Sequence, residues 1–199
     1  MATFNTPTLP TAGSYREKGS KFLSFSIPVA TVEEAEENIQ RIKKEYYDSR
    51  HVCFAWRIGA RAEHSRAFDA GEPAHSAGTP ILNEIRSLEL SNILIVVVRY
   101  FGGTKLGIPG LIEAYREASR DALGTAEFVP LVVLQKLTIR YPYPFTTEVK
   151  KAMHRFPPVA SEDSFGEDCF SVLTYQEEMY ESAREYFEEI GILEREGMP

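Results

Sequence analysis

The chain has no long hydrophobic run. Its longest purely aliphatic stretch, from Ile93 to Val98, has six residues, whereas a membrane-spanning helix needs about 20. The N-terminus also lacks the apolar core of a secretory signal. We therefore expect a cytoplasmic protein that does not associate with membranes.

Cysteine is scarce. Cys53 and Cys169 are the only two, which is too few for a disulfide framework, and neither has the Cys-x-x-Cys neighbour of a metal site. Both are predicted to be buried free thiols, as is usual for cysteine outside such sites. We expect no metal and no cofactor.

The chain also lacks an excess of positive charge. Its formal charge is -7 and its pI is about 5.2, so no global field attracts nucleic acid, and no DNA partner is expected. The charge is uneven along the chain. Residues 1–131 carry 15 Lys and Arg against 16 Asp and Glu, whereas residues 132–199 carry 7 against 13. An anionic partner is therefore expected to meet the first part.

Hydrophobic periodicity predicts alternating strands and helices in the first part. The first 14 residues, rich in Thr and Pro, are interpreted as a frayed arm. The segments with a period are a strand at Lys21–Val29, a helix after a Thr31/Glu34 capping box, a strand at His51–Ile58, a helix from Thr79 to Leu88, a doubly buried strand at Ile93–Val98 and a helix from Pro109 to Gly124. Residues 65–77 show no periodicity.

Two of these segments allow specific predictions. In the strand at His51–Ile58, the side chains of Val52, Phe54, Trp56 and Ile58 should pack under the helices, with His51, Cys53 and Arg57 on the opposite face. In the next helix, Thr79 should be the N-cap and Pro80 the first helical residue, with Ile81, Ile85 and Leu88 facing inward.

Pro130 marks the predicted boundary between two domains, 1–130 and 131–199. Beyond it the pattern is strand, helix, strand, strand, helix, strand, which is the order of a ferredoxin-like βαββαβ domain. The segments are Val132–Arg140, Thr146–Arg155, Val159–Phe165, Cys169–Tyr175, Tyr180–Ile190 and Ile192–Glu196.

The segment from Asp69 to Pro80 is the first candidate site. It places two carboxylates, Asp69 and Glu72, with Gly71 and His75 directly before a predicted helix N-terminus. Free backbone amides and the helix dipole attract anions at such a position. The alternative is a structural loop in which Asp69 and Glu72 cap backbone amides.

The segment from Arg99 to Gly107 is the second candidate site. It joins the buried strand to the next helix, where α/β sheets commonly bind ligands. Arg99 and Lys105 offer positive charge, Tyr100 and Phe101 offer flat rings for stacking, and Gly102, Gly103 and Gly107 allow a close backbone approach. The spacing is that of neither a P-loop nor a dinucleotide-binding loop. The alternative is a simple strand-to-helix turn with Phe101 in the core.

These two segments, together with Lys18–Phe22 (KGSKF) and His51–Trp56 (HVCFAW), resemble the IMPACT/YigZ family. The strongest stretches are DAGEPAHSAGTPIL (Asp69 to Leu82) and LSNILIVVVRYFGGTKLGIPGLIEAY (Leu90 to Tyr115). The resemblance implies an α+β protein of two domains. The N-terminal domain would be a two-layer α/β domain like domain IV of elongation factor G, and the C-terminal domain would be ferredoxin-like, as in domain V of that factor.

The resemblance also implies a link to translational regulation, with no catalytic activity firmly attached. This chain departs from the family motifs DDGEP-x-G-T-A-G-R-P and K-L-G-T-G-G-L. The departures are Ala70, His75, Ser76, Thr79, Ile108 and Pro109. Loss of the family's Arg, where Thr79 stands, and of its Thr, where Ile108 stands, removes one expected anion contact and one helix cap.

The leading hypothesis is a non-enzymatic factor that binds RNA, the ribosome or a translation-associated protein, with no residue assigned a catalytic role. The candidate binding residues are Arg99, Tyr100, Phe101, Gly102, Gly103, Lys105, Gly107, Asp69, Gly71, Glu72, His75 and His51. The rival hypothesis is an enzyme that acts on a small anionic or nucleotide-like substrate between the two segments, with carboxylates and histidines as acid–base groups. A third hypothesis, a pure protein–protein adaptor, would place the binding surface on the acidic second domain. We also expect Glu72 to lie near Arg99 or Lys105 at one end of the sheet.

Overall fold

The computed structural model describes residues 4–192. Contacts between residues group the chain into two compact units, Met1–Leu131 and Val132–Pro199, and we propose that these units are the two domains. The chain has the predicted mixed α and β composition. Across the described residues, no helix is both long enough and apolar enough to cross a membrane.

The first unit is built on a five-stranded antiparallel sheet with the order β2-β3-β6-β4-β5. The strands are β2 (Thr11–Glu17), β3 (Ser20–Pro28), β4 (His51–Ile58), β5 (His64–Phe68) and β6 (Ile93–Tyr100). The helices are α1 (Val32–Glu45), α2 (Gly78–Ser87) and α3 (Gly107–Gly124). Strands β1 (Asn5–Pro7) and β7 (Phe128–Pro130) form a separate antiparallel pair.

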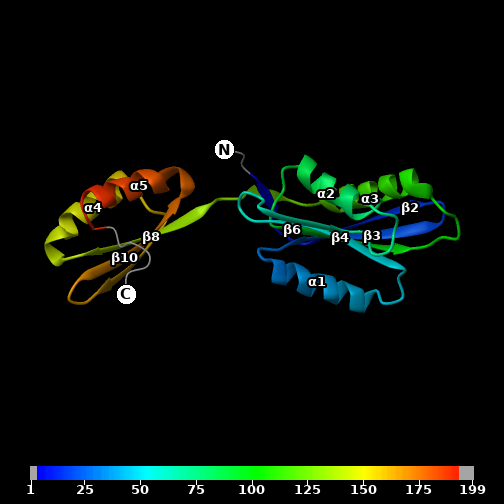
Figure 1. Ribbon diagram of the computed structural model, residues 1–199, viewed down its shortest axis with the longest axis horizontal. Helices are drawn as coiled ribbons and strands as arrows, with labels where there is room; N and C mark the ends of the chain where they lie inside the picture. The colour runs from blue at the N-terminus through cyan, green and yellow to red at the C-terminus, as the bar shows by residue number, and fades with distance from the viewer. Residues whose placement is uncertain (1–3, 193–199) are drawn as a thin grey trace. The chain divides into compact units, whose positions relative to one another are not determined.

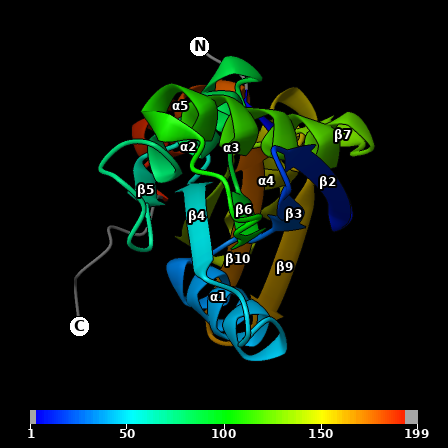
Figure 2. The same cartoon turned by 90° about the vertical axis from the view of Figure 1, so that its right-hand side faces the viewer.

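Helices cover both faces of this sheet, so the predicted two-layer arrangement gains a third layer. Figures 1 and 2 show α2 and α3 on one face and α1 on the other. The central strand β6 explains why, because all six residues from Ile93 to Val98 are fully buried. Aliphatic side chains on both faces of one strand require an apolar cover on each side.

The strand β4 has the predicted register. Val52, Phe54, Trp56 and Ile58 pack against α1, whereas Cys53 and Ala55 pack on the opposite face in the core beneath α2 and α3. Trp56 is 6% exposed, and Arg57 lies outside the core with its guanidinium over the Phe4 ring. The alternation in the sequence therefore predicted the register correctly, but it did not predict that α2 and α3 also cover the Cys53 face.

Several local predictions were wrong. Residues 5–7 and 11–14 belong to strands rather than to a frayed arm, and residues 64–68 form the edge strand β5, which overlaps the segment that showed no period. All five residues of β5 are exposed, so hydrophobicity gave no signal. In α2, Ile81 and Ile85 are buried as predicted, but Leu88 is exposed and Leu82 is buried in its place.

The second unit contains β8 (Leu134–Tyr141), a 3-10 turn η1 (Tyr143–Phe145), α4 (Thr146–Arg155), β9 (Ala160–Phe165), β10 (Cys169–Gln176) and α5 (Glu177–Glu189). Its antiparallel sheet has the order β8-β10-β9, as a ferredoxin-like fold requires. Helices α4 and α5 share one face (Figure 1). Of the predicted last strand, residues 193–196 lie outside the described residues, and the Ile192 carbonyl accepts a hydrogen bond from the Arg140 amide.

Candidate functional site

The two candidate segments meet at one end of the five-stranded sheet. Arg99, near the end of β6, lies opposite Phe22 on one side and His51 on the other. The segment after Asp69 returns to this end, where the Ala70 carbonyl is 2.8 Å from His51 Nδ1. The predicted proximity of the two segments is therefore confirmed.

A buried ion pair joins them. Arg99 Nη1 donates to Glu72 Oε1 at 2.6 Å, and the two side chains are only 6% and 4% exposed. The Tyr115 hydroxyl donates to the same carboxylate oxygen at 2.9 Å. We predicted that Glu72 would lie near Arg99 or Lys105, and Arg99 is confirmed. A buried pair is costly to break, because the remaining charge has no compensation.

Burial changes the role that Arg99 can have. Its guanidinium lies between the rings of Phe22 and Phe101, 5.5 and 5.7 Å from their centroids, and Nη2 is 3.4 Å from Ser20 Oγ. Its positive charge is neutralised by Glu72. Arg99 therefore positions the second segment and is not free to hold an anion.

The same interior contains a thiol and a phenol. Cys53 Sγ donates to the Asp69 carbonyl at 3.0 Å and lies 3.3 Å from the Tyr115 hydroxyl. Burial raises the pKa of Cys53 to about 12 and also raises the pKa of Tyr115. Neither group ionises near neutral pH, so neither is suited to act as a nucleophile or base there.

Asp69 serves as the cap of α2. Its Oδ1 accepts from the amides of Ala77 and Gly78 at 3.0 and 2.8 Å, and its Oδ2 accepts from the His75 amide at 3.0 Å. The prediction that Thr79 is the N-cap was wrong, because Asp69 reaches the helix start from eight residues before Ala77. The carboxylate occupies the amides that were expected to attract an anion.

The two histidines of this region have different surroundings. His75 is exposed, and its Nδ1 is 3.1 Å from Thr79 Oγ1. His51 Nε2 is 3.9 Å from Glu72 Oε1, and Gly71, at φ +84°, packs close to the His51 ring. Among residues 4–192, no group of three or more His, Cys, Asp or Glu side chains is arranged to hold a metal ion.

The second segment is held to the β2–β3 hairpin by backbone contact. A Cβ on Gly102 would overlap the backbone of Gly19 and Ser20, and the Gly102 amide donates to Ser20 Oγ at 3.2 Å. Gly103 and Gly107 have φ of +89° and +71°, the left-handed region that favours glycine. The glycines thus shape the loop and bring the hairpin against it.

Five exposed or half-buried cations surround this junction. They are Arg16, Lys18, Lys21, Arg50 and Lys105, here called the cationic rim, and within the described part of the chain none of them forms an ion pair. Arg16 pairs with Lys21 across β2 and β3, and Lys21 pairs with Tyr100 across β3 and β6. Sequence reasoning assigned only Lys105 to the site. The KGSKF segment was the available signal for two others.

Two aromatic rings lie beside the rim. Phe101 is 46% exposed, so the alternative that placed it in the core was wrong, and Tyr47, in the turn after α1, is 85% exposed. Tyr100 is half-buried, packs toward α1 and donates to Asp48 Oδ1 at 2.8 Å. The surface at this end therefore combines unpaired positive charge with accessible rings.

Comparison with known proteins places this α+β fold in a family. A model of the Impact N-terminal domain matches residues 18–123, more than half of the chain. The chain therefore belongs to the IMPACT family, as the resemblance indicated.

Relatives and a solved structure agree with this assignment. IMPACT family member YvyE of Bacillus subtilis is 41% identical over 104 residues, 52% of this chain and 48% of the relative. IMPACT family member YigZ of Escherichia coli is 34% identical over 125 residues, 62% of this chain and 61% of the relative. The alignments thus span about half to three fifths of these relatives. A crystal structure described as that of a hypothetical protein covers 99% of this chain and 100% of its own, with a TM-score of 0.72 and 23% identity, which shows a shared fold.

Proposed function

We propose that this chain is a non-enzymatic translation factor that binds single-stranded RNA, alone or within the ribosome, through the cationic rim. Membership in the IMPACT family supports the link to translation, because the family is associated with translational regulation. The cationic rim is the observation that carries the proposal.

The chemistry of the rim favours RNA over other anions. Its cations are distributed over β2, β3, the turn between them, the turn before β4 and the loop after β6, which suits a chain of phosphates better than one small anion. Phe101 and Tyr47 offer ring faces on which unpaired bases stack, as single-stranded RNA sites commonly do. The acidic second unit would repel RNA, so binding is expected to be confined to the rim.

The enzymatic alternative has less support. That scheme used Asp69, Glu72 and two histidines, His51 and His75, as acid–base groups, and Arg99 and Lys105 to hold the anion. Of these, Asp69, Glu72 and Arg99 are engaged in capping or in the buried pair. The only rim residue in that scheme with a free charge is Lys105. No second function is favoured by a specific observation.

Salt-dependent binding of a labelled single-stranded oligoribonucleotide tests the proposal. The triple variant Lys18→Ala, Lys21→Ala, Lys105→Ala should bind more weakly. The slope of log affinity against log salt should shrink by about 2, since each lost phosphate contact on a single strand contributes about 0.7. The matched control is Lys136→Ala, Lys150→Ala, Lys151→Ala, which removes equal charge from the second unit and should leave the slope unchanged. Equal slopes for the two variants would contradict a local site.

Co-sedimentation with ribosomes separates free RNA from the assembled particle. We expect the wild-type chain to pellet with ribosomes at low salt and the triple rim variant to remain in the supernatant. If wild-type protein binds the oligoribonucleotide but never pellets, the target is RNA outside the ribosome. Failure in both assays would refute the proposal.

A further inference from the structure

The strand β9 is an open sheet edge in the second unit. It pairs with β10 on one side only, and no described residue pairs with its other side. The Gly166 amide donates to the Asp168 carbonyl at 3.0 Å. This bond shows which residues of the antiparallel hairpin direct their backbone groups toward the partner strand. Since inward and outward backbone groups alternate along a strand, the N–H and C=O groups of Ser161, Asp163 and Phe165 point outward.

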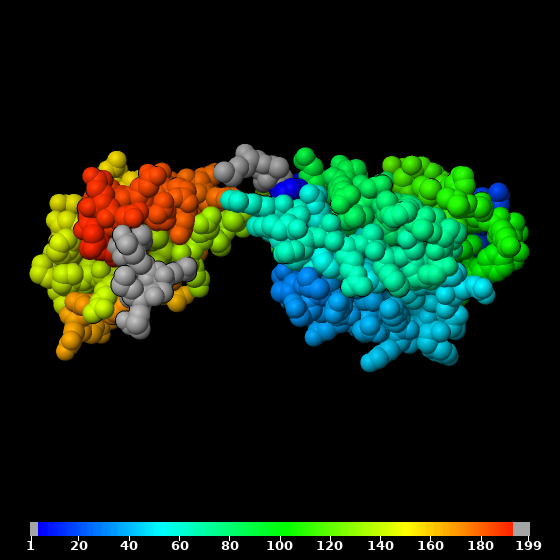
Figure 3. Space-filling model, viewed as in Figure 1, coloured from blue at the N-terminus to red at the C-terminus, as the bar shows by residue number. Residues whose placement is uncertain are grey.

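One edge of the first sheet, the strand β2, is treated differently. On β2, the Ser14 amide donates to Asp121 Oδ2 and Thr11 Oγ1 donates to the Ala122 carbonyl, both at 2.7 Å, so α3 covers that edge. All six residues of β9 are exposed, and the strand contains neither the Lys nor the Pro that commonly protects an edge. Figure 3 shows the turn between β9 and β10 (orange) at the surface.

The charge around β9 indicates what can pair with it. Residues 156–183 contain seven Asp and Glu and no Lys or Arg. Within residues 4–192, Glu162 and Asp163 of β9 and Glu167 of the turn form no ion pair. A second copy of β9 would bring carboxylates against carboxylates, which destabilises a cross-strand pair. A basic strand would instead place its cations opposite them.

Apolar side chains flank the acidic centre of the strand. Val159, just before β9, is 53% exposed, and Phe165, at its end, is 64% exposed. An added strand carries its side chains alternately on the two sheet faces. A partner that mixes basic and apolar residues would therefore neutralise the carboxylates and cover these two side chains.

We propose that β9 binds an extended peptide segment, rich in Lys or Arg with interspersed apolar residues, which a partner protein contributes as an added antiparallel or parallel strand. Backbone hydrogen bonds to Ser161, Asp163 and Phe165 would give affinity, as in other strand-addition complexes. Glu162 and Asp163 would give selectivity for positive charge. The site is separate from the cationic rim and does not depend on its function.

A capped peptide of alternating Lys and Val tests strand addition to the full-length chain, with binding followed by fluorescence anisotropy. The decisive variant is Asp163→Pro, because proline at an outward edge position removes one outward N–H and blocks an incoming strand while sparing the internal ladder. Asp163→Asn is the matched control, since it removes the same charge and leaves the backbone open. We expect at least a tenfold loss for Asp163→Pro and at most a few-fold loss for Asp163→Asn.

A modified peptide gives the same test without changing the protein. Methylation of alternate backbone amides removes donors and should abolish binding to the wild-type chain. Equal binding of methylated and unmodified peptides would overturn the proposal, as would equal binding by Asp163→Pro and wild type. If the chain self-associates without peptide and Asp163→Pro abolishes that self-association, β9 binds a second copy of the chain and the proposal is overturned. The triple rim variant should bind the peptide normally, so failure here is distinguishable from failure of RNA binding.

Discussion

The main sheets of the two units bury their side chains in different ways. In the first unit, β6 is buried on both faces between α1 and the pair α2 and α3. In the second unit, β10 alternates between buried and half-buried residues, because α4 and α5 cover one face only. A strand with a continuous aliphatic run therefore needs helices on both faces of its sheet, whereas a strand with an alternating pattern needs them on one face only.

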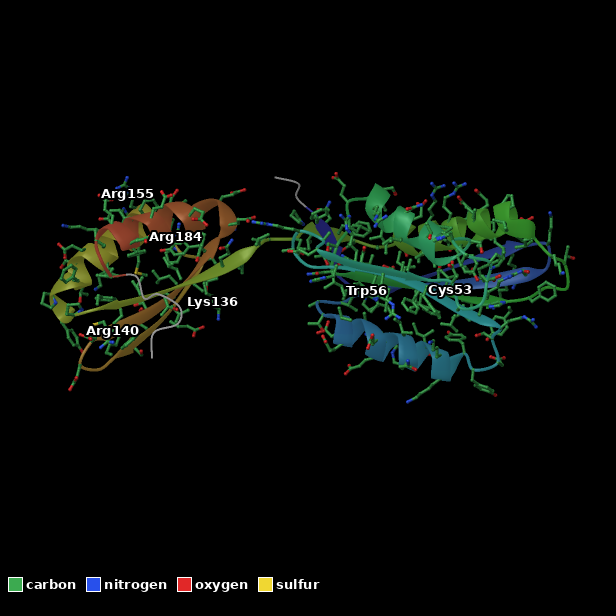
Figure 4. All side chains as sticks on the ribbon, in the orientation of Figure 1. Cys53, Trp56, Lys136, Arg140, Arg155 and Arg184 are labelled. Atoms are coloured by element: carbon green, nitrogen blue, oxygen red, sulfur yellow. The ribbon has the colours of Figure 1, made fainter. Side chains whose placement is uncertain are left out.

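The same difference decides where charge can be placed. The two-sided sheet encloses the Glu72–Arg99 pair, whereas the Arg140–Asp168 pair of the second unit has side chains 57% and 29% exposed. Lys136 and Arg140 are on β8, and Arg155 and Arg184 are on the helices (Figure 4). Among the described residues, positive charge in the second unit is thus solvated, and the enclosed charged pair belongs to the first unit.

Breaking one ion pair in each unit gives the largest expected contrast. Glu72→Ala should destabilise the first unit by about 3–5 kcal/mol, because Arg99 is left buried without compensation. Asp168→Ala should cost about 0–1 kcal/mol, as is typical of exposed pairs. Urea unfolding followed by the fluorescence of Trp56, the single tryptophan, measures the first effect, and hydrogen exchange in β10 measures the second.

A double variant sharpens this result. Glu72→Met with Arg99→Met should recover much of the stability lost in Glu72→Ala, since apolar replacement of a whole buried pair is often neutral or stabilising. If Glu72→Ala alone is as mild as Asp168→Ala, the enclosed pair is not the anchor of the two segments.

Substitutions along the two central strands test the burial pattern itself. The side chains of Leu94 and Ile95 point to opposite faces of β6. Replacing either one by Ala should cost about 2–5 kcal/mol of stability. On β10, Leu173→Ala should cost as much, whereas Val172→Thr on the open face should change stability by no more than about 0.5 kcal/mol. A large loss for Val172→Thr would show that the second sheet is covered on both faces. Urea unfolding series for the four variants provide the comparison.

The start of α2 offers a smaller effect. Asp69→Ala should cost about 0.5–2 kcal/mol because it removes the oxygen atoms that cap the helix, whereas Thr79→Ala should cost less than about 0.5 kcal/mol. Thermal unfolding of both variants measures the difference. The opposite ranking would restore Thr79 as the cap.

Cysteine labelling gives the mildest test. Burial raises the pKa of Cys53 to about 12, so only about one molecule in ten thousand holds a thiolate there at pH 8, and alkylation of the native protein should be slow. In rising urea, Cys169 should be labelled before Cys53, since the second unit has 68 residues and a small domain buries less of its surface. Mass spectrometry after timed iodoacetamide pulses measures the order. Earlier labelling of Cys53 would reverse the ranking of the two units.

Local pattern was sufficient to predict most of the fold. The helix α4 begins and ends at the predicted residues, Thr146 and Arg155, since its period and flanking prolines are local signals. The strand β5 was missed because it lies at an edge with every residue exposed, so it carries no hydrophobic alternation. The residues before Lys21 were misjudged because their composition is that of a loop, while their partners are β3 and β7.

The candidate site was predictable in position but not in detail. The order of the elements along the chain predicted that both segments lie at one end of the sheet. The prediction that Glu72 lies near Arg99 or Lys105 followed from that. Burial of this pair did not follow, because it depends on Phe22, Tyr115 and other residues distant in the sequence. Capping by Asp69 was foreseen only as the alternative for its segment, because a carboxylate that folds back over eight residues leaves no periodic signal.

The contact between Gly19 and Gly102 has a consequence for how this surface can vary. Two backbones in direct contact set the distance between the hairpin and the loop, so the outline of the junction does not depend on which side chains project from it. Lys18, Lys21 and Lys105 can then be exchanged for other residues without moving the scaffold. The charge of this surface can therefore be redesigned while the two glycines keep the junction in place.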